Sequence, residues 1–228
     1  MKLPICDITP FTLQDFPDHT ACILWFGGCN MRCKYCHNPE LVLGKKKRLQ
    51  MEDVMQFLKE RQKLLDGVVI SGGECTLSPE LPSFIKKIRG MGYKIKLDTN
   101  GLRPDMLGVM LAKDYLDYVS LDYKAPRGKF EEVTGKAGFD LFRRSLDVLC
   151  RHHTPFEVRT TVHTSLIDED DVNSIISDLN EHEFKGNYYI QNFEDAPTTI
   201  GRLPKQKRRL NMNYLLKPKS FSLHTRNF

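Results

Sequence analysis

Three cysteines near the start of the chain have the types and the spacing of a metal-cluster site. Cys29, Cys33 and Cys36 form a C-x3-C-x2-C pattern on one short loop, and His37 follows directly. Thiolate sulfur is a soft ligand that selects iron–sulfur clusters and zinc. A [4Fe–4S] cube held by three protein thiolates keeps one iron open, and an open iron can bind and activate a substrate. The pattern therefore predicts a reactive cluster at this loop.

Two other uses of these cysteines fit the sequence less well. A structural zinc site normally has four ligands, and His37 adjoins Cys36 too closely for both to converge on one tetrahedral ion. A disulfide framework does not suit an odd count of seven cysteines in a chain of 228 residues. A non-catalytic metal-binding module stays open as the alternative outside the enzyme classes.

The elements that must position this loop alternate between strand and helix. Strands are predicted over residues 21–26, 67–71, 93–97, 118–121, 156–162 and 187–190. Helices are predicted over residues 51–64, 79–89, 105–113, 139–151 and 171–182. The alternation implies right-handed βαβ units and a parallel sheet, which is an α/β fold. Six strands suit either a partial (β/α)6 TIM-like barrel or a flat doubly wound sheet.

Polar side chains follow the carboxyl ends of most of these strands, where barrel enzymes build their active sites. The strand-end groups are Gly72-Gly73-Glu74, Asp98-Thr99-Asn100, Asp122 with Lys124, and His163. Taken singly, each has an ordinary explanation as a turn, a helix cap, a surface lysine or a structural histidine. Arg159, inside a strand, likewise suits a structural ion pair. Their common position at strand ends favours the barrel and one shared site.

With these motifs in place, the chain resembles the radical S-adenosylmethionine (SAM) enzymes, and among them the activating enzymes of glycyl-radical proteins. Residues 15–17 and 28–40 are most similar to the anaerobic ribonucleoside-triphosphate reductase activating group, and next to the pyruvate formate-lyase activators. The resemblance covers about residues 5–193. It implies the radical SAM fold, an oxidoreductase activity, and both a [4Fe–4S] cluster and SAM as cofactors.

The resemblance also implies which residues form the site. The metal ligands and catalytic centre would be Cys29, Cys33 and Cys36. The SAM-binding residues would be Tyr35, Gly72, Gly73, Glu74, Asp98, Thr99, Asn100, Asp122, Lys124 and His163. Two departures from the family pattern stand near them, since Cys75 replaces a usual proline and Asp18 replaces a usual glycine.

Individual roles follow from the same resemblance. Glu74 would receive the SAM amino group, and Lys124 would pair with the SAM carboxylate. Tyr35 would pack beside the adenine, and His163 would contact the ribose. The chain lacks the cysteine-rich insert of many glycyl-radical activators, which implies a single cluster and a minimal activator.

The implied reaction begins with flavodoxin or ferredoxin as the electron donor. SAM would then lose its S–C5′ bond, and the resulting 5′-deoxyadenosyl radical would take a hydrogen atom from a glycine of a partner enzyme. The most similar group points to anaerobic ribonucleotide reductase as that partner. A pyruvate formate-lyase type of partner, a small molecule and RNA stay open as alternatives.

Composition sets the remaining expectations. The chain carries a net charge of +5, and eight Lys or Arg with no acid follow Asp195, so residues 1–195 carry 5 − 8 = −3. We expect a radical SAM domain over residues 1–195 and a basic C-terminal tail over 196–228. Without a membrane-spanning run, the sequence predicts a cytoplasmic protein with no membrane partner. The tail leaves nucleic acid as a less favoured partner, and its apolar residues predict that part of it docks on a surface.

Overall fold

The computed structural model describes residues 2–195 and 198–228, which divide into two compact units. The first unit comprises residues 2–30, 40–99 and 103–120. The second comprises residues 31–39, 100–102 and the described residues from 121 to 228. Residues 196 and 197, where the predicted tail begins, lie outside the described residues. Among the described residues, no helix has the length and apolar composition needed to cross a membrane.

The strands of the first unit form a largely parallel arrangement. Strands β1 (Ile5–Thr12), β2 (Ala21–Phe26), β3 (Gly67–Gly72) and β4 (Lys94–Thr99) occur in chain order. β1 is antiparallel to β2, whereas β2, β3 and β4 are mutually parallel neighbours. Phe26 pairs with Gly72, so the carboxyl ends of β2 and β3 are level. The loop that carries the first cysteine therefore leaves the sheet beside the loop that carries Glu74.

The helices of the first unit are short and mostly amphipathic. They are α1 (Pro39–Val42), α2 (Met51–Glu60), α3 (Leu81–Arg89) and α4 (Pro104–Leu111), and residue 39 belongs to the second unit. On α3 the buried residues are Leu81, Phe84, Ile85 and Ile88, which share one face at helical spacing. The strands between the helices are buried almost throughout, as expected for parallel strands.

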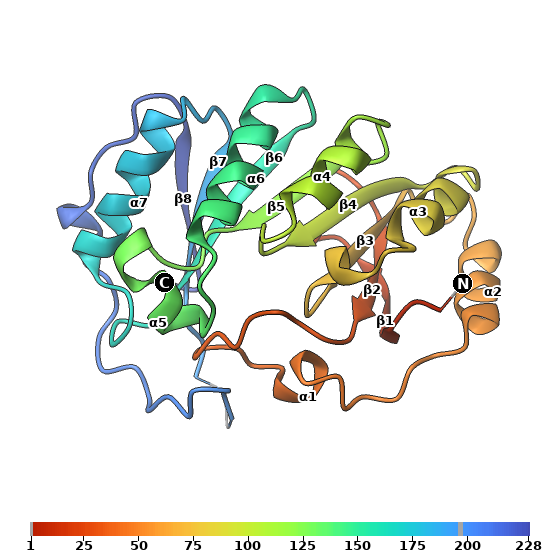
Figure 1. The fold of residues 1–228 in the computed structure, drawn as a ribbon, viewed down its shortest axis with the longest axis horizontal. Coiled ribbons are helices and arrows are strands. Elements are labelled where there is room, and N and C mark those ends of the chain that lie inside the picture. The colour runs from red at the N-terminus through yellow and green to blue at the C-terminus, as the bar shows by residue number, and fades with distance from the viewer. Residues whose placement is uncertain (1, 196–197) are drawn as a thin grey trace. The chain divides into compact units, whose positions relative to one another are not determined.

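The second unit continues the alternation. β5 (Tyr118–Asp122) runs into it from the first unit, and α5 (Phe130–Thr134), α6 (Phe139–Arg151), β6 (Phe156–Val162), α7 (Glu169–Glu181), β7 (Asn187–Asn192) and β8 (Ser222–Arg226) follow. β6, β7 and β8 are parallel neighbours, and α6 and α7 run alongside them (Figure 1). Phe139 and Phe142 on α6 pack with Phe130 on α5 and with Tyr123 to form an aromatic cluster. The Asp168 and Asp171 side chains close a capping box that fixes the start of α7.

Most predicted elements are present, but several boundaries differ. The helix predicted over 51–64 ends at Glu60, and Lys63 beyond it adopts a left-handed φ of 67° that is incompatible with a helix through residue 64. Leu64, which the helical pattern placed on the apolar face, is 72% exposed. The third predicted strand begins at Lys94 and extends through Thr99, so Asp98 and Thr99 belong to β4 itself.

The segment after residue 198 is folded onto the second unit. β8 pairs in parallel with β7, and the Phe221 ring lies 5.4 Å from the Phe184 ring. Before these anchors, the Asn173 side chain on α7 donates to the Tyr214 carbonyl and accepts from the Leu216 amide. Leu210 is buried, whereas the Tyr214 and Leu216 side chains are 70% and 48% exposed. Docking on its own chain therefore accounts for only part of the apolar content of the basic segment.

Candidate active site

In the first unit, the glycines of two neighbouring loops bring Cys29 beside Gly73. The Gly73 amide donates to the Phe26 carbonyl at 2.8 Å, and the Glu74 amide donates to the Gly28 carbonyl at 2.9 Å. A Cβ on Gly73 would lie 2.0 Å from the Gly28 carbonyl oxygen and 3.2 Å from the Cys29 Cβ. Only a residue without a side chain permits this backbone approach. The second glycine of the predicted motif is therefore a requirement of the cysteine loop's position.

Glu74 is buried, and protein donors converge on its carboxylate. Its Oε1 accepts from the Thr76 amide at 3.2 Å and from the Thr99 hydroxyl at 2.9 Å. The side chain also caps the short 3-10 helix Cys75–Leu77. A carboxylate fixed in this way is an acceptor of defined direction, which suits an ammonium group.

Asp98 is already engaged with protein partners. One carboxylate oxygen lies 2.5 Å from the Lys96 Nζ, and the other accepts from the Ser71 hydroxyl at 3.0 Å. Lys96 is only 2% exposed, so this is an ion pair inside the unit. Lys96 was not among the predicted site residues, although a lysine between the apolar Ile95 and Leu97 of a buried strand is a signal that could have identified it.

Cys75 follows Glu74 in the chain and packs against the carboxyl end of β4. Its thiol is within 3.3 Å of the Asp98 carbonyl oxygen, and the side chain is buried. Burial, aided by the carboxylates of Glu74 and Asp98, raises the pKa of this thiol well above its ordinary value. Cys75 is therefore a protonated packing residue, in contrast to the exposed or charge-stabilised thiols that bind metals.

In the second unit, α5 holds the part of the cysteine loop that carries Cys33 and Cys36. The Arg32 amide donates to the Thr134 carbonyl at 2.7 Å, and the Lys34 amide donates to the Val133 carbonyl at 2.9 Å. The Cys36 amide closes a turn onto the Cys33 carbonyl at 2.9 Å. The residues on either side of Cys33 are thus bonded to α5, and Cys36 is bonded to Cys33 through the backbone turn.

Tyr35 lies between these cysteines and carries an unusual hydroxyl. The residue is buried, and its hydroxyl oxygen has no hydrogen-bond partner among the described residues. A buried hydroxyl without a partner costs roughly 1–3 kcal/mol. The Lys124 Nζ lies 6.0 Å from the centre of the ring. An unpartnered polar atom beside two predicted ligands is the feature expected where a bound group is absent.

Lys124 stands at one end of a row of alternating charges. Its Nζ lies 3.0 Å from the Asp122 carboxylate, which also accepts from the Arg159 Nε at 2.9 Å. Arg159 approaches Glu157 at 3.9 Å, and Arg226 on β8 approaches the same carboxylate at 3.8 Å. Burial, the largest single effect, opposes the charge on Lys124, but Asp122, Tyr35 and Cys33 together outweigh it, so the pKa of Lys124 lies well above its ordinary value. Lys124 is therefore held as a cation.

Asn100 belongs to the second unit and makes a local turn there. Its side-chain oxygen accepts from the Leu102 amide at 3.0 Å, and the residue is buried. The neighbouring Gly101 carbonyl accepts from the Ser145 hydroxyl at 2.6 Å. These bonds hold residues 100–102 within the second unit, so one function of Asn100 is structural.

His163 is buried, and both of its ring nitrogens contact protein atoms. Nε2 lies 3.0 Å from the Pro204 carbonyl oxygen, and Nδ1 lies 2.8 Å from the Ser165 hydroxyl. Because a carbonyl oxygen only accepts, Nε2 carries the proton in this arrangement. The predicted contact with a ribose would require one of these bonds to be replaced. The partner segment around Pro204 was not part of the predicted site.

The predicted residues therefore fall into two groups, each consistent within its unit. The first unit brings together Cys29, Gly72, Gly73, Glu74, Asp98 and Thr99. The second unit contains Cys33, Tyr35, Cys36, Asn100, Asp122, Lys124 and His163. Within that second group, the Phe193 ring joins His163 to the cysteine loop, at 4.9 Å from His163 and 4.7 Å from His37.

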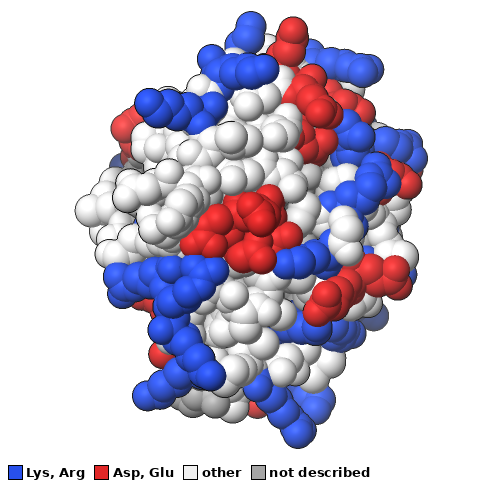
Figure 2. All heavy atoms as spheres, turned by 90° about the vertical axis from the view of Figure 1, so that its left-hand side faces the viewer, with Lys and Arg blue, Asp and Glu red and all other residues white. Residues whose placement is uncertain are grey.

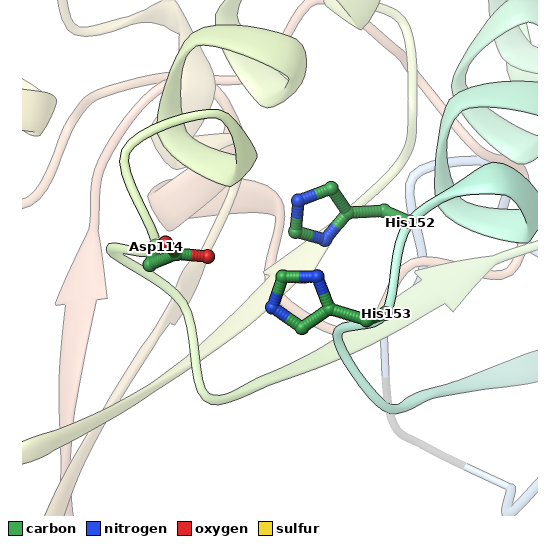
Figure 3. A group of neighbouring side chains, drawn as sticks. All are labelled: Asp114, His152 and His153. Atoms are coloured by element: carbon green, nitrogen blue, oxygen red, sulfur yellow. The ribbon is translucent and has the colours of Figure 1, made fainter.

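A pair of histidines lies apart from the predicted site residues of the second unit. The rings of His152 and His153, just after α6, are stacked with their centres 4.2 Å apart (Figure 3). The His152 Nδ1 lies 2.9 Å from the Thr154 hydroxyl. This contact organises the turn between α6 and β6.

The charges of the C-terminal segment are partly compensated. Figure 2 shows a face on which acidic side chains gather in a central patch with lysines and arginines around it. Within the second unit, Arg208 forms two bonds with Glu169 at 2.7 and 2.8 Å, and Arg226 approaches Glu157. A surface of mixed sign differs from the uniform basic stripe that nucleic-acid binding requires.

Comparison with known proteins identifies relatives whose sequences match most of this chain. Residues 23–176 match the Radical SAM superfamily. Over 203 residues, the chain is 30% identical to a protein of Methanocaldococcus jannaschii described as a "putative glycyl-radical enzyme activating enzyme", covering 85% of this chain and 81% of that one. It is 32% identical over 139 residues to the pyruvate formate-lyase-activating enzyme of Clostridium pasteurianum, covering 55% and 56%.

A solved structure shares the fold. The anSMEcpe structure with bound AdoMet has a TM-score of 0.59 at 19% identity, over 74% of this chain and 50% of that chain. The chain thus spans about half the length of this structure and of the clostridial relative, and most of the archaeal one. The predicted fold class, an α/β chain with the partial-barrel radical SAM fold, is confirmed.

Proposed function

This chain belongs to the radical SAM superfamily, and on that premise we propose that it generates a glycyl radical on a partner enzyme. It is a radical SAM enzyme that uses a [4Fe–4S] cluster and SAM. The observation that carries the proposal is the similarity to the archaeal activating enzyme, which extends over 85% of this chain and 81% of that protein. Similarity over nearly the whole of both chains supports a shared type of substrate better than a shared domain alone would.

The residues present fit both cofactors. Three cysteines on one loop supply the soft ligands of a cluster with one open iron. The buried Tyr35 hydroxyl has no partner among the described residues, and Gly28, with φ of 88°, has no atom within 4 Å of where a Cβ would stand. When bound, the cluster and SAM supply a carbon-centred radical that can take a hydrogen atom from glycine.

The protein's own contribution is binding and orientation. We assign Glu74 to the SAM amino group, because its carboxylate is buried and held by Thr76 and Thr99. We assign Lys124 to the SAM carboxylate, because it is paired with the Asp122 carboxylate at 3.0 Å and its pKa lies well above its ordinary value. Asp122 is in turn oriented by Arg159, so the lysine is set by a chain of ion pairs rather than by a single contact.

We further propose anaerobic ribonucleoside-triphosphate reductase as the partner, and flavodoxin or ferredoxin as the reductant. The support is the sequence around the cysteine loop, residues 15–17 and 28–40, which resembles the activators of that reductase most closely. A pyruvate formate-lyase type of partner is the next choice, since a pyruvate formate-lyase activator is among the relatives.

The test is anaerobic reconstitution with iron and sulfide, followed by reduction in the presence of SAM and each candidate partner. Electron paramagnetic resonance (EPR) should then show a glycyl doublet that depends on partner and SAM. Cys36→Ala should abolish it, whereas Cys150→Ala, a cysteine on α6, should not. Formation of 5′-deoxyadenosine without a doublet on any candidate would refute the activase proposal and favour a small-molecule or RNA substrate.

A further inference from the structure

The C-terminal segment contains a stretch that binds directly to the cluster loop. Within residues 199–208, which we call the strap, the Ile200 amide donates to the Cys36 carbonyl at 3.2 Å. The adjacent Gly201 amide donates to the Lys34 carbonyl at 2.8 Å. The strap therefore forms two consecutive main-chain bonds with the loop, one of them to a predicted cluster ligand.

Gly201 makes this contact possible. A Cβ at this position would lie 2.6 Å from the Lys34 Cβ, 2.8 Å from its Cα and 2.8 Å from its carbonyl oxygen. Real Cβ atoms essentially never approach other heavy atoms within 3.0 Å. Two of the three atoms are backbone, so a side-chain rotation of Lys34 does not relieve the overlap. The close approach is specific to glycine at this position.

The same strap holds the segment that carries His163. The Pro204 carbonyl accepts from the His163 Nε2 at 3.0 Å. The Gln206 side chain accepts from the Thr164 amide at 3.0 Å and donates to the Asn192 side chain at 2.7 Å. One ten-residue stretch thus connects the cluster loop with the carboxyl ends of β6 and β7.

The strap is fixed at its far end. Arg208 forms a two-pronged ion pair with Glu169 at the start of α7, and its carbonyl accepts from the Thr164 hydroxyl at 2.7 Å. The Asn211 amide also donates to Glu169 at 2.8 Å. Because the strap is bonded to the start of α7, its own position is fixed, and its two bonds to the cluster loop hold that loop in place.

We infer that the strap is a positioning element for the cluster, and that Gly201 and Gln206 are positioning residues for the cluster loop and His163. The contacts that support this role all lie within the second unit, and the cluster follows from membership of the radical SAM superfamily. It is independent of which partner or substrate receives the radical. The strap touches the backbone of the cluster loop, so its effect reaches the cluster through Lys34 and Cys36.

The experiment uses full-length protein with Gly201→Ala, and Gly128→Ala as the matched control. Gly128 belongs to the same unit and has no atom within 4 Å of the added Cβ. After anaerobic reconstitution we expect Gly201→Ala to alter the EPR spectrum of the reduced cluster and its change on adding SAM. Cleavage of SAM should slow by roughly tenfold or more, because small displacements of reacting groups have effects of this size. Gly128→Ala should match the wild type in each measurement.

A second pair of variants tests the bonds of Gln206 with Thr164, the residue after His163, and with Asn192. Gln206→Met keeps the shape but removes both hydrogen bonds, whereas Gln206→Glu keeps an acceptor for the Thr164 amide. We expect the SAM-induced spectral change to be altered in Gln206→Met and partly restored in Gln206→Glu. The inference is overturned if Gly201→Ala and Gln206→Met both give wild-type spectra with and without SAM. It is also overturned if they lower only the melting temperature.

Discussion

The contact between Gly73 and Gly28 gives the most direct test of how the first unit positions the cluster. A Cβ on Gly73 would stand 2.0 Å from the Gly28 carbonyl oxygen, while 3.0 Å is the closest approach that real Cβ atoms show. Gly73→Ala must therefore move the two loops apart by at least 3.0 − 2.0 = 1.0 Å. Cys29 follows Gly28 directly, and its own Cβ is only 3.2 Å from the same position.

A displacement of this size exceeds what a metal centre tolerates. Metal–ligand distances hold to within about 0.2 Å, so the shift is several times the tolerance. Overpacking of this kind costs about 1–3 kcal/mol of stability, less than the 5–15 kcal/mol typical of a folded domain. We therefore expect Gly73→Ala to fold but to bind much less iron and sulfide after reconstitution.

The assay is iron and sulfide content per chain, with circular dichroism to establish that the variant is folded. Gly108→Ala is the matched control, because this helical glycine of the same unit has open space around its Cβ position. A folded Gly73→Ala that binds iron as fully as the wild type would show that the loop contact does not set the position of Cys29, and would refute the reasoning.

Three further predictions follow from individual contacts. Glu74→Gln should raise the Kd for SAM roughly 10- to 100-fold, since a hydrogen bond to a charged group contributes about 1.5–3 kcal/mol; calorimetry against Glu52→Gln measures this, and an unchanged Kd contradicts the assignment. Tyr35→Phe should not lower the melting temperature without SAM, because the hydroxyl has no partner among the described residues; a clear decrease in thermal scans would contradict this. The hydrogen bond from Arg208 lowers the pKa of Glu169 to about 2 from 4.5, so its stabilisation is complete above pH 4.5 and is lost as the pH falls through 2. The melting temperatures of Arg208→Ala and wild type should therefore converge on acidification, and a constant difference would contradict the pairing.

The parts of the fold that could be predicted are those whose signal is local. β2 and β6 were predicted with their observed bounds, since each is a compact run rich in apolar and β-branched residues. β1 was missed, because it is an edge strand with an irregular register against β2 and Pro10 within it. β8 was missed because its exposed, polar sequence becomes a strand only by pairing with β7.

The candidate site divides in the same way. The cysteine pattern and the strand-end groups are short motifs, so the sequence alone could propose them. Arg226 and the strap act through partners that are distant in sequence, and no periodicity predicts such contacts. Lys96 pairs with Asp98 two residues away, and its only sequence signal is its place between Ile95 and Leu97. The boundary at residue 195 was drawn from charge composition and stays a prediction, while the pairing of β8 with β7 could not be read from composition.

His163 illustrates why a strand-end position does not by itself define a role. The sequence predicted a ribose contact, but its Nε2 is bound to the Pro204 carbonyl and its Nδ1 to Ser165. A ribose hydroxyl can bond Nε2 only by displacing a carbonyl that belongs to the strap, and the strap is fixed by Gly201 on one side and Arg208 on the other. A contact between ribose and Nε2 therefore requires movement of the strap, which would also change its bond to Cys36. If His163 instead keeps both bonds when SAM binds, its function is to hold the strap in place. Replacement of His163 should then change the EPR spectrum of the cluster and leave the affinity for SAM largely unchanged.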